Sequence, residues 1–412
     1  MSQDQLADLS RLLYSPVTLL LYVSAAIVCL YALSTRVALH ETRSGRPVGE
    51  RLQRLGIALA WTAVAAHVAH EIVRGLAQNR LPLGNMFEFT SAMALAGALV
   101  GLVYLTLVRR KPELVGFVML AAAVVVSSAM LTYADPGPLM PILDTWWRTF
   151  HVTVIVVAAG IFTVGFLFNG LHLLRDTAEQ GLAAARAVPT GRSTVGAAHI
   201  DDLAPGVVDD ERDRGADDPG RDVSGRVAPD EDHEVATLPR EAERNAMRAA
   251  ISPLRLAVGT FLGTSTVSWV FVATPTTTLQ EGLTRALTVN LVLVALALVA
   301  RWFVPFLPQA STLDGLAYRI IALGFFAWTF GVIAGAMWAE QSWGRFWGWD
   351  PKETASFLTW IAYAAYLHAR ATKGTRGRGA GWIGIGAFAV LMFTYYAVNL
   401  VFVGLHSYAG LS

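Results

Sequence analysis

Tryptophans crowd one short stretch of this 412-residue chain, "AEQSWGRFWGWDPKETASFLTW" at residues 339–360. Trp343 and Trp347 lie four residues apart, and Gly344 and Gly348 repeat the same spacing. On a helical segment the two indoles would therefore share one face, beside a backbone that the glycines keep free of side chains. Such a surface could bind a flat aromatic ligand at close range.

Charged and aromatic neighbours flank these tryptophans. Trp338 and Trp349 would extend the aromatic surface. Arg345 and Lys352 would supply cations for the carboxylates of a ligand. Asp350, which precedes a proline, predicts a turn that ends the surface before the next apolar run. The alternative is an interfacial belt, because tryptophan is enriched at the headgroup level of membrane proteins. Clustering beside a charged turn favours ligand binding.

Two histidines are placed to join this site. His151 follows "DTWWRTF" and begins an apolar run, whereas His406 follows the last apolar run. If both lie on the face of the tryptophan-rich stretch, they supply two axial imidazoles, while the aromatics and cations supply a porphyrin pocket. A zinc site would instead need three or four His, Cys or carboxylate ligands and would not use the tryptophans. The residue types therefore indicate haem.

The composition places these residues in a membrane protein. Hydrophobic residues make up 54% of the chain and charged residues only 15%, and several apolar runs exceed the roughly 18 residues that read as a transmembrane helix. The net charge of +1 gives no indication of a nucleic-acid partner. Cys29 is the only cysteine, so this chain cannot perform dithiol chemistry by itself. Basic residues after the first apolar run also argue against a cleavable signal peptide.

The apolar runs predict an all-α, polytopic bundle of about eight to ten transmembrane helices. For two of these segments, near 254–274 and 285–307, two outcomes are open. If both span, they form a hairpin that leaves later orientations unchanged, and if only one spans, the predicted orientation fails. The other eight are expected near 17–38, 55–73, 87–108, 114–133, 150–173, 318–338, 356–371 and 382–403.

The chain divides into four regions. An N-terminal bundle of about five spans occupies 1–174 and is followed by an acidic, cytoplasmic insert at 175–250. The insert is predicted to be disordered because it has too few apolar residues to form a core. The extra hairpin falls in 251–310, and 311–412 forms the tryptophan-rich core.

Loop charge predicts the orientation. Arg and Lys concentrate in the short loops 36–54, 109–111 and 370–378, which should be cytoplasmic by the positive-inside rule. Both termini then lie on the outer, extracytoplasmic face. The same count places the loops 74–85 and 135–151 there, together with the tryptophan-rich stretch and the C-terminal tail.

Two other sets of polar residues fall in predicted spans. His67 and His70 lie three apart on one helix face and could join a haem path, but a structural role within the bundle is favoured because buried imidazoles can satisfy one another or a carbonyl. Glu88 at a helix end is better placed to orient the adjacent loop than to act as a general base.

The segment "WAEQSWGRFWGWDPKETASFLTWIAYAAYLHAR", followed by "GLHSY", closely resembles the tryptophan-rich WWD signature of the CcsA/ResC haem-handling proteins of system II cytochrome c maturation, called CcsB in some bacteria. The resemblance is most specific over 313–408. It extends more loosely to "RLPLGNMFEF" at 80–89 and "WWRTFHV" at 146–152.

This resemblance implies a plasma-membrane protein that holds haem b at the outer face and joins it to the CxxCH motif of an exported apocytochrome c. It implies a Ccs1/ResB-type membrane subunit as partner, a thiol-disulfide reductant supplied by another protein, and an enzymatic role as the haem lyase component of the complex. His151 and His406 would be the axial iron ligands, and the WWD segment would shape the pocket. His368 matches the family's intramembrane histidine, which is thought to hold haem in transit.

The chain departs from the family pattern in two places. Arg80 stands where several relatives have a histidine, and 175–310 has no counterpart in a typical relative. Two alternative functions remain. A haem transporter without lyase activity would use the same residues, whereas a proton-coupled transporter without haem would need a charged pair deep within the spans.

Overall fold

The computed structural model contains only helices among the residues it describes, which confirms the all-α prediction. Eight of these helices are long and apolar enough to cross a membrane, so this is a multi-pass membrane protein. The described residues are 1–38, 46–137, 145–187, 240–273, 278–372, 377–402 and 404.

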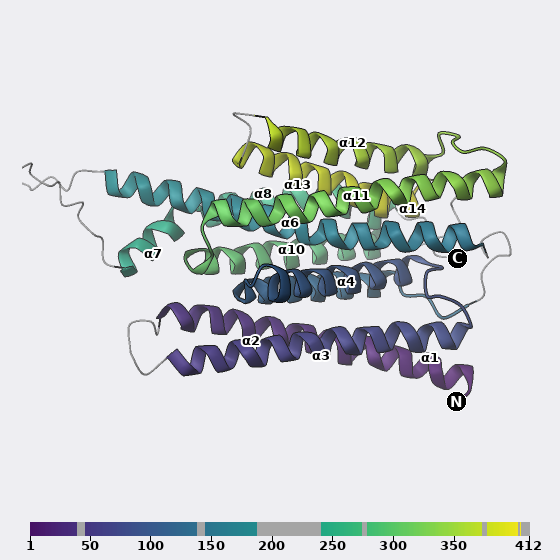
Figure 1. Cartoon of the computed structure of the whole chain (residues 1–412), viewed down its shortest axis with the longest axis horizontal. Helices are drawn as coiled ribbons and strands as arrows, with labels where there is room; N and C mark the ends of the chain where they lie inside the picture. The colour runs from purple at the N-terminus through teal and green to yellow at the C-terminus, as the bar shows by residue number, and fades with distance from the viewer. Residues whose placement is uncertain are drawn as a thin grey trace, which may run out of the picture.

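The N-terminal half forms six helices that run along the length of the molecule (Figure 1). They are α1 (Gln3–Leu12), α2 (Leu19–Ala38), α3 (Arg46–Gln78), α4 (Met86–Val103), α5 (Val115–Ala129) and α6 (Trp146–Ala187). Short 3-10 or π turns extend or connect them at Leu13–Thr18, Tyr104–Val108, Pro112–Leu114 and Met130–Thr132.

The C-terminal half adds eight described helices, of which α7 lies outside the bundle. They are α7 (Arg240–Ala249), α8 (Pro253–Ser268), α9 (Val270–Ala273), α10 (Leu279–Phe303), α11 (Ala310–Trp343), α12 (Pro351–Ala371), α13 (Arg378–Met392) and α14 (Val398–Leu400). Further turns lie at Val304–Phe306 and Phe393–Ala397.

Two predicted spans form helices that are not among the eight. α8 packs against α10, as expected of a hairpin, but only α10 has the length and composition of a span. α12 packs between α11 and α13 along the bundle (Figure 1), yet its threonines, tyrosines, His368 and Arg370 make it more polar than its neighbours.

The predicted insert differs from the structure at both ends. α6 continues past residue 175 to Ala187, with Ala178 and Leu182 buried. α7 returns beside it, where Arg186 forms an ion pair with Glu243. The remaining insert residues, 188–239, lie outside the described residues, and so do His199 and His233.

Glycines let α6 approach its neighbours closely. A Cβ atom at Gly160 would lie 2.6 Å from the carbonyl oxygen of Met93 on α4, and one at Gly331 would lie 2.6 Å from a side-chain carbon of Ile155. Small residues at such crossings allow membrane helices to pack by van der Waals contact, since lipid provides no hydrophobic force between them. α6 is therefore the central helix against which α4 and α11 pack.

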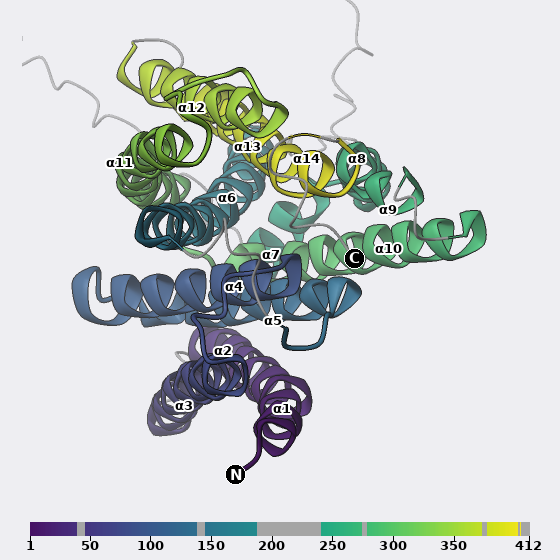
Figure 2. The same cartoon turned by 90° about the vertical axis from the view of Figure 1, so that its right-hand side faces the viewer.

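The loops that sequence analysis assigned to one face gather at one end of the bundle, called the loop end here. Figure 1 places the N-terminus, the 79–85 loop, the start of α6, the 344–350 loop and the end of α14 there. Figure 2, which views this end, shows α1 to α3 on one side of α4 and α5, and α6 with α11 to α13 on the other. Which side of the membrane the loop end faces stays a prediction.

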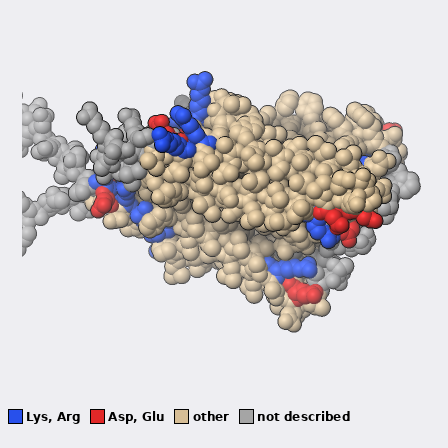
Figure 3. Space-filling model, turned by 90° about the horizontal axis from the view of Figure 1, so that it is seen from below, with Lys and Arg blue, Asp and Glu red and all other residues tan. Residues whose placement is uncertain are grey.

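Charged side chains avoid the middle of the molecule. On the face shown in Figure 3, the Lys, Arg, Asp and Glu side chains lie towards the two ends and leave an uncharged zone between them. A bilayer requires such a zone, because a charge at its centre is costly.

Glu88 organises the loop end around a buried charge network. Its carboxylate is fully buried and accepts hydrogen bonds from Arg74 Nε at 2.9 Å, Arg80 NH1 at 2.9 Å and the backbone N–H of Gly84 at 2.7 Å. This geometry agrees with the prediction that Glu88 orients the adjacent loop.

The two arginines extend this network to a second segment. Arg74 donates to the carbonyl of Ala134 at 2.7 Å, and Arg80 donates to the carbonyl of Gly137 at 3.0 Å. The network therefore fixes the 79–85 loop and residues 134–137 to the start of α4.

The histidine pair on α3 has hydrogen-bond partners from neighbouring helices. His67 contacts Tyr22 Oη at 3.1 Å and Ser91 Oγ at 3.0 Å with its two ring nitrogens. His70 Nδ1 donates to the carbonyl of Ser10 at 2.8 Å. Both nitrogens of His67 are used, which favours a structural role for that residue, whereas His70 Nε2 is buried without a hydrogen-bond partner among the described residues.

Replacing Glu88 by alanine should lower the free energy of unfolding by roughly 3–5 kcal/mol, because two arginines would lose their buried carboxylate partner. Thermal unfolding of the purified protein in detergent measures this change. Glu113→Ala is the control, since its pair with Lys111 is more exposed and should contribute less than about 1 kcal/mol. Equal losses in the two variants would contradict the proposed importance of the buried network.

Candidate functional site

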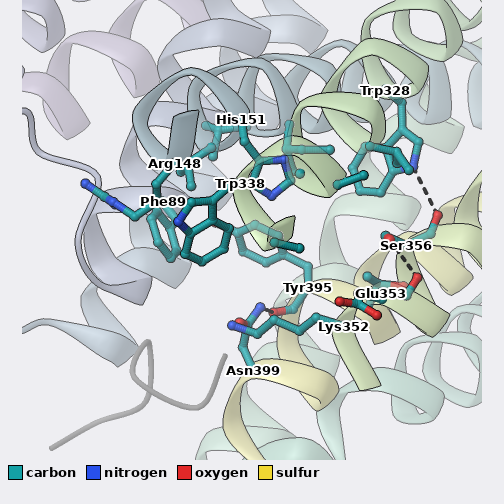
Figure 4. Close-up of a pocket in the computed structure, with 18 of the residues that line it drawn as sticks. Phe89, Arg148, His151, Trp328, Trp338, Lys352, Glu353, Ser356, Tyr395 and Asn399 are labelled. Atoms are coloured by element: carbon teal, nitrogen blue, oxygen red, sulfur yellow. Dashed lines mark hydrogen bonds between the residues drawn. The ribbon is translucent and has the colours of Figure 1, made fainter. Parts of the chain in front are cut away.

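A pocket opens at the loop end between α4, α6, α11, α12 and α13 with the turn that follows it (Figure 4). Its cavity volume is about 150 Å³. We call it the end pocket. Its polar and aromatic lining residues are Phe89, Arg148, His151, Trp328, Trp338, Phe346, Trp347, Lys352, Glu353, Ser356, Thr394, Tyr395 and Asn399.

His151 is the imidazole of the end pocket. Its Nδ1 atom lies 2.7 Å from the carbonyl oxygen of Gly331, which can only accept, so Nδ1 carries the hydrogen. In the neutral ring, Nε2 is then the basic nitrogen, and it has no hydrogen-bond partner among the described residues. A backbone carbonyl that fixes one ring nitrogen in this way is typical of metal-ligating histidines.

Aromatic rings pack around this imidazole. The His151 ring lies nearly parallel to the buried indole of Trp338, with 6.1 Å between centroids. Trp328, also on α11, donates from Nε1 to the carbonyl of Ser356 at 3.2 Å, which fixes its orientation. Trp347 completes the aromatic lining from the loop after α11.

Two cationic side chains line the same pocket. Arg148 is 3% exposed and donates to the carbonyl of Leu83 at 2.8 Å, which ties the start of α6 to the 79–85 loop. Lys352 precedes the apolar part of α12. Burial lowers the pKa of its ammonium group to about 7, against the opposing effect of Asp350. An anionic ligand would therefore favour the charged form of Lys352.

The start of α12 is closed by reciprocal capping. The side chain of Asp350 accepts from the N–H of Lys352, and Glu353 Oε2 accepts from the N–H groups of Gly348 at 2.7 Å and Asp350 at 3.2 Å. This capping box satisfies N–H groups that a helix start otherwise leaves unpaired. It also holds the 344–350 loop against the end pocket.

The structure corrects one prediction about the tryptophans. α11 ends at Trp343, because Gly344 adopts a left-handed conformation with φ of 66°. The prediction that Trp343 and Trp347 share a helical face is therefore wrong. Trp347 lines the end pocket from the loop, whereas Trp343 is not among the lining residues and packs against Trp338, at a centroid distance of 5.0 Å.

Three predicted site residues lie in the loop but do not line the pocket. The Arg345 guanidinium occupies the space where a Cβ atom at Gly348 would be. Trp349 is 66% exposed and has a φ of 58°, which is uncommon for a residue other than glycine. Asp350 caps α12.

The two remaining predicted histidines are not placed in the pocket. His368 lies in the last turn of α12, at the opposite end from the loop end, and its side chain is exposed. His406 lies outside the described residues. Gly404, two residues earlier, lies beside the start of α12, because a Cβ atom there would lie 2.7 Å from Asp350 Oδ1.

Sequence analysis did not identify several lining residues. Arg148 lies three residues before His151 on the same helix, so helical spacing could have indicated it. Glu353 could have been predicted from the sequence, because it is the third residue after Asp350, the N-cap of a capping box. Trp328 and Tyr395 come from other helices, and only the tertiary packing brings them to His151.

Comparison with known proteins identifies the family. A family model described as "Cytochrome C assembly protein" matches residues 83–406, which include most of the membrane helices and the end pocket. This chain belongs to that family. Its curated relatives are cytochrome c biogenesis proteins of the CcsA type.

Relatives with the printed name "Cytochrome c biogenesis protein CcsA" match part of the chain. The relative from Synechocystis sp. (strain ATCC 27184 / PCC 6803 / Kazusa) is 53% identical over 102 residues, or 25% of this chain and 30% of the relative. That from Gloeothece citriformis (strain PCC 7424) is 54% identical over 99 residues, or 24% and 30%. That from Gloeobacter violaceus (strain ATCC 29082 / PCC 7421) is 52% identical over 103 residues, or 25% and 30%. The match thus spans less than a third of each relative.

Gly335 leaves room for the His151 ring, since a Cβ atom there would lie 2.7 Å from Cε1. Gly335→Ala should displace the ring, break its bond to Gly331 and destabilise the protein by about 1–3 kcal/mol. Gly315→Ala on the same helix is the control, because nothing lies within 4 Å of its added Cβ atom and alanine favours a helix by up to about 1 kcal/mol. Thermal unfolding should give shifts of opposite sign, and equal stabilisation would show that the ring tolerates the added methyl group.

Proposed function

We propose that the end pocket holds haem through His151 and presents it for thioether bond formation with the CxxCH motif of apocytochrome c. The chain would act as the haem lyase component of its complex. The observation that carries this proposal is the fixed imidazole, whose Nδ1 donates to Gly331 and whose Nε2 is left to ligate iron.

The rest of the lining suits the same ligand. Trp338 and Trp347 offer flat apolar surfaces for a porphyrin, and Arg148 and Lys352 are cations for its propionates. The protein contributes position and a low-polarity environment, because the addition of a thiol to a vinyl group is chemistry of the two substrates themselves.

The size of the cavity suggests how haem sits in it. At about 150 Å³, it is smaller than the roughly 300–1,000 Å³ typical of small-molecule pockets. A porphyrin would therefore enter only in part and leave one edge at the mouth. An exposed edge is what an apocytochrome needs in order to reach the vinyl groups.

His406 is the proposed second axial ligand. Gly404, two residues earlier in the chain, lies against Asp350, which is two residues from the pocket-lining Lys352, and this supports a position of His406 near the iron. His368 is proposed to hold haem in transit from the cytoplasmic side. Its exposed side chain would let a Ccs1/ResB-type subunit supply the other ligand of that inner site.

The proposed setting follows from loop charge and family resemblance. The loop end faces the outside of the plasma membrane, where the exported apocytochrome arrives with its cysteines kept reduced by another protein. Haem b is the substrate. Transport of haem without attachment is the second candidate, and covalent haem on a co-expressed CxxCH protein distinguishes the two. The buried pair Arg74 and Glu88 lies at the loop end of its helices, whereas His67 Nε2 and Glu71 lie 3.6 Å apart further along α3, so the haem absorption spectrum is what distinguishes this proposal from a proton-coupled transporter.

His151→Gly should leave an imidazole-sized gap beside the iron while the aromatic walls remain. Haem content should fall several-fold, and added imidazole should restore the low-spin absorption spectrum and part of the thioether yield. His406→Gly should respond in the same way. His199→Gly, in the insert, is the control and should leave the spectrum unchanged.

Trp347→Ala distinguishes the loss of an iron ligand from the loss of an aromatic wall of the pocket. It should also lower haem content, but imidazole cannot replace an indole, so no rescue is expected. The ligand assignment is rejected if imidazole rescues neither histidine variant in folded protein, or if both variants keep an unaltered bis-histidine spectrum.

Compartment reporters fused along the chain test the proposed orientation. Fusions within 40–50, 200–240 and 373–379 should report the cytoplasm, and fusions within 136–146 and at the C-terminus should report the outside. A C-terminus found in the cytoplasm would separate His406 from His151 and would refute the bis-histidine site.

A further inference from the structure

Glu353 is an unexpected residue in a pocket for an anionic ligand. It lies on the pocket side of α12, next to Lys352 and Ser356 (Figure 4), and only 9% of its surface is exposed. The propionates of haem would be repelled by a carboxylate placed here. Its presence therefore requires a role that an uncharged side chain could not fill.

The two oxygens of this carboxylate have different environments. Oε2 accepts from the backbone N–H groups of Gly348 and Asp350 and so completes the cap of α12. Oε1 is shielded from water and has no hydrogen-bond partner among the described residues. A buried polar atom without a partner is costly unless a partner arrives or the group is protonated.

The capping role uses only Oε2. A glutamine could supply the same acceptor to the two N–H groups, and both Glu and Gln are found at this position of a capping box. The cap alone therefore does not account for a carboxylate whose second oxygen is left buried beside the pocket. What distinguishes Glu from Gln is the ability to gain and lose a proton.

We propose that Glu353 transfers the proton in thioether formation. This inference rests on the function proposed above. The S–H bond of the cysteine and the carbon–carbon double bond of the vinyl group break, and a C–S and a C–H bond form. Glu353 Oε1 gives a proton to the terminal vinyl carbon and recovers one from the thiol as sulfur bonds to the inner vinyl carbon. Nothing is oxidised or reduced, and the carboxyl group is regenerated.

The fixed position of the carboxylate suits this role. Two backbone donors hold Oε2, so Oε1 is presented in one orientation, and it is buried from water. Proton transfer by a positioned side chain typically accelerates a reaction by about 10²–10⁴-fold. The charged or titratable groups around it, which also enter any pH profile, are Arg148 and His151 on α6, Asp350 and Lys352 at the start of α12, and Tyr395 after α13.

The test uses the full-length protein with its partner subunit, loaded with haem and mixed with a reduced CxxCH peptide. Glu353→Gln should keep the haem content and spectrum and slow thioether formation by about 100-fold. It should also flatten the pH dependence of the rate. Glu353→Asp, which can still carry a proton, should retain more of the rate than Glu353→Gln. Glu340→Gln is the matched control, because Glu340 is an exposed carboxylate on α11 at the same end.

A second readout does not depend on turnover. Infrared difference spectra between haem-free and haem-loaded protein should contain a carboxyl band that is lost in Glu353→Gln and kept in Glu340→Gln. An unchanged rate and pH profile in Glu353→Gln would overturn the inference, and so would a loss of haem parallel to the loss of rate, since that indicates a structural cap. Failure of the unmodified protein to form any adduct would instead reject the proposed function.

Discussion

The hydrogen bond between His151 Nδ1 and the carbonyl of Gly331 depends on how closely α6 and α11 pack. Glycine at 331 and 335 removes the side chains that would otherwise keep the imidazole away from the α11 backbone. The same approach buries Trp338 beside the ring. The chemistry of the end pocket therefore follows from a helix–helix crossing of the kind that small residues permit in membranes. The same packing of α6 against α11 therefore forms both the site and part of the core of the bundle.

Charge at the loop end is organised by backbone groups as much as by ion pairs. Arg148 reaches a loop carbonyl, Arg74 and Arg80 reach others, and Glu353 is fixed by N–H groups of the preceding loop. Most of these bonds join a helix to a connecting segment, and the bond of Arg80 joins two connecting segments. The loops that form the pocket rim are thus held by the helices whose ends they connect, so the pocket is largely preformed for a rigid ligand.

The sequence predicted most of the helices because apolar runs of membrane length have few alternative structures. It also predicted Trp338, Trp347, Lys352 and His151 in one site. The prediction that Trp343 and Trp347 share a helical face failed, because Gly344 adopts a left-handed conformation and ends α11 between them. The sequence could not place Tyr395, because nothing in the local pattern of that helix indicates which face meets α6. Local spacing thus identified residues on one element, while contacts between distant elements required the packing itself.

The geometry of His151 bears on how haem would leave the proposed site. An apocytochrome that supplies its own histidine would have to displace one of the two proposed axial imidazoles. His151 is held by a hydrogen bond to α11, by the close approach of Gly335 and by the parallel ring of Trp338, so its withdrawal would disturb the central helix pair. The other axial imidazole, proposed to be His406, follows α14 by only a few residues and does not belong to that pair. Ligand exchange on the His406 side therefore leaves the α6 and α11 packing intact, which is why we expect His151 to be the last contact that the protein makes with the iron.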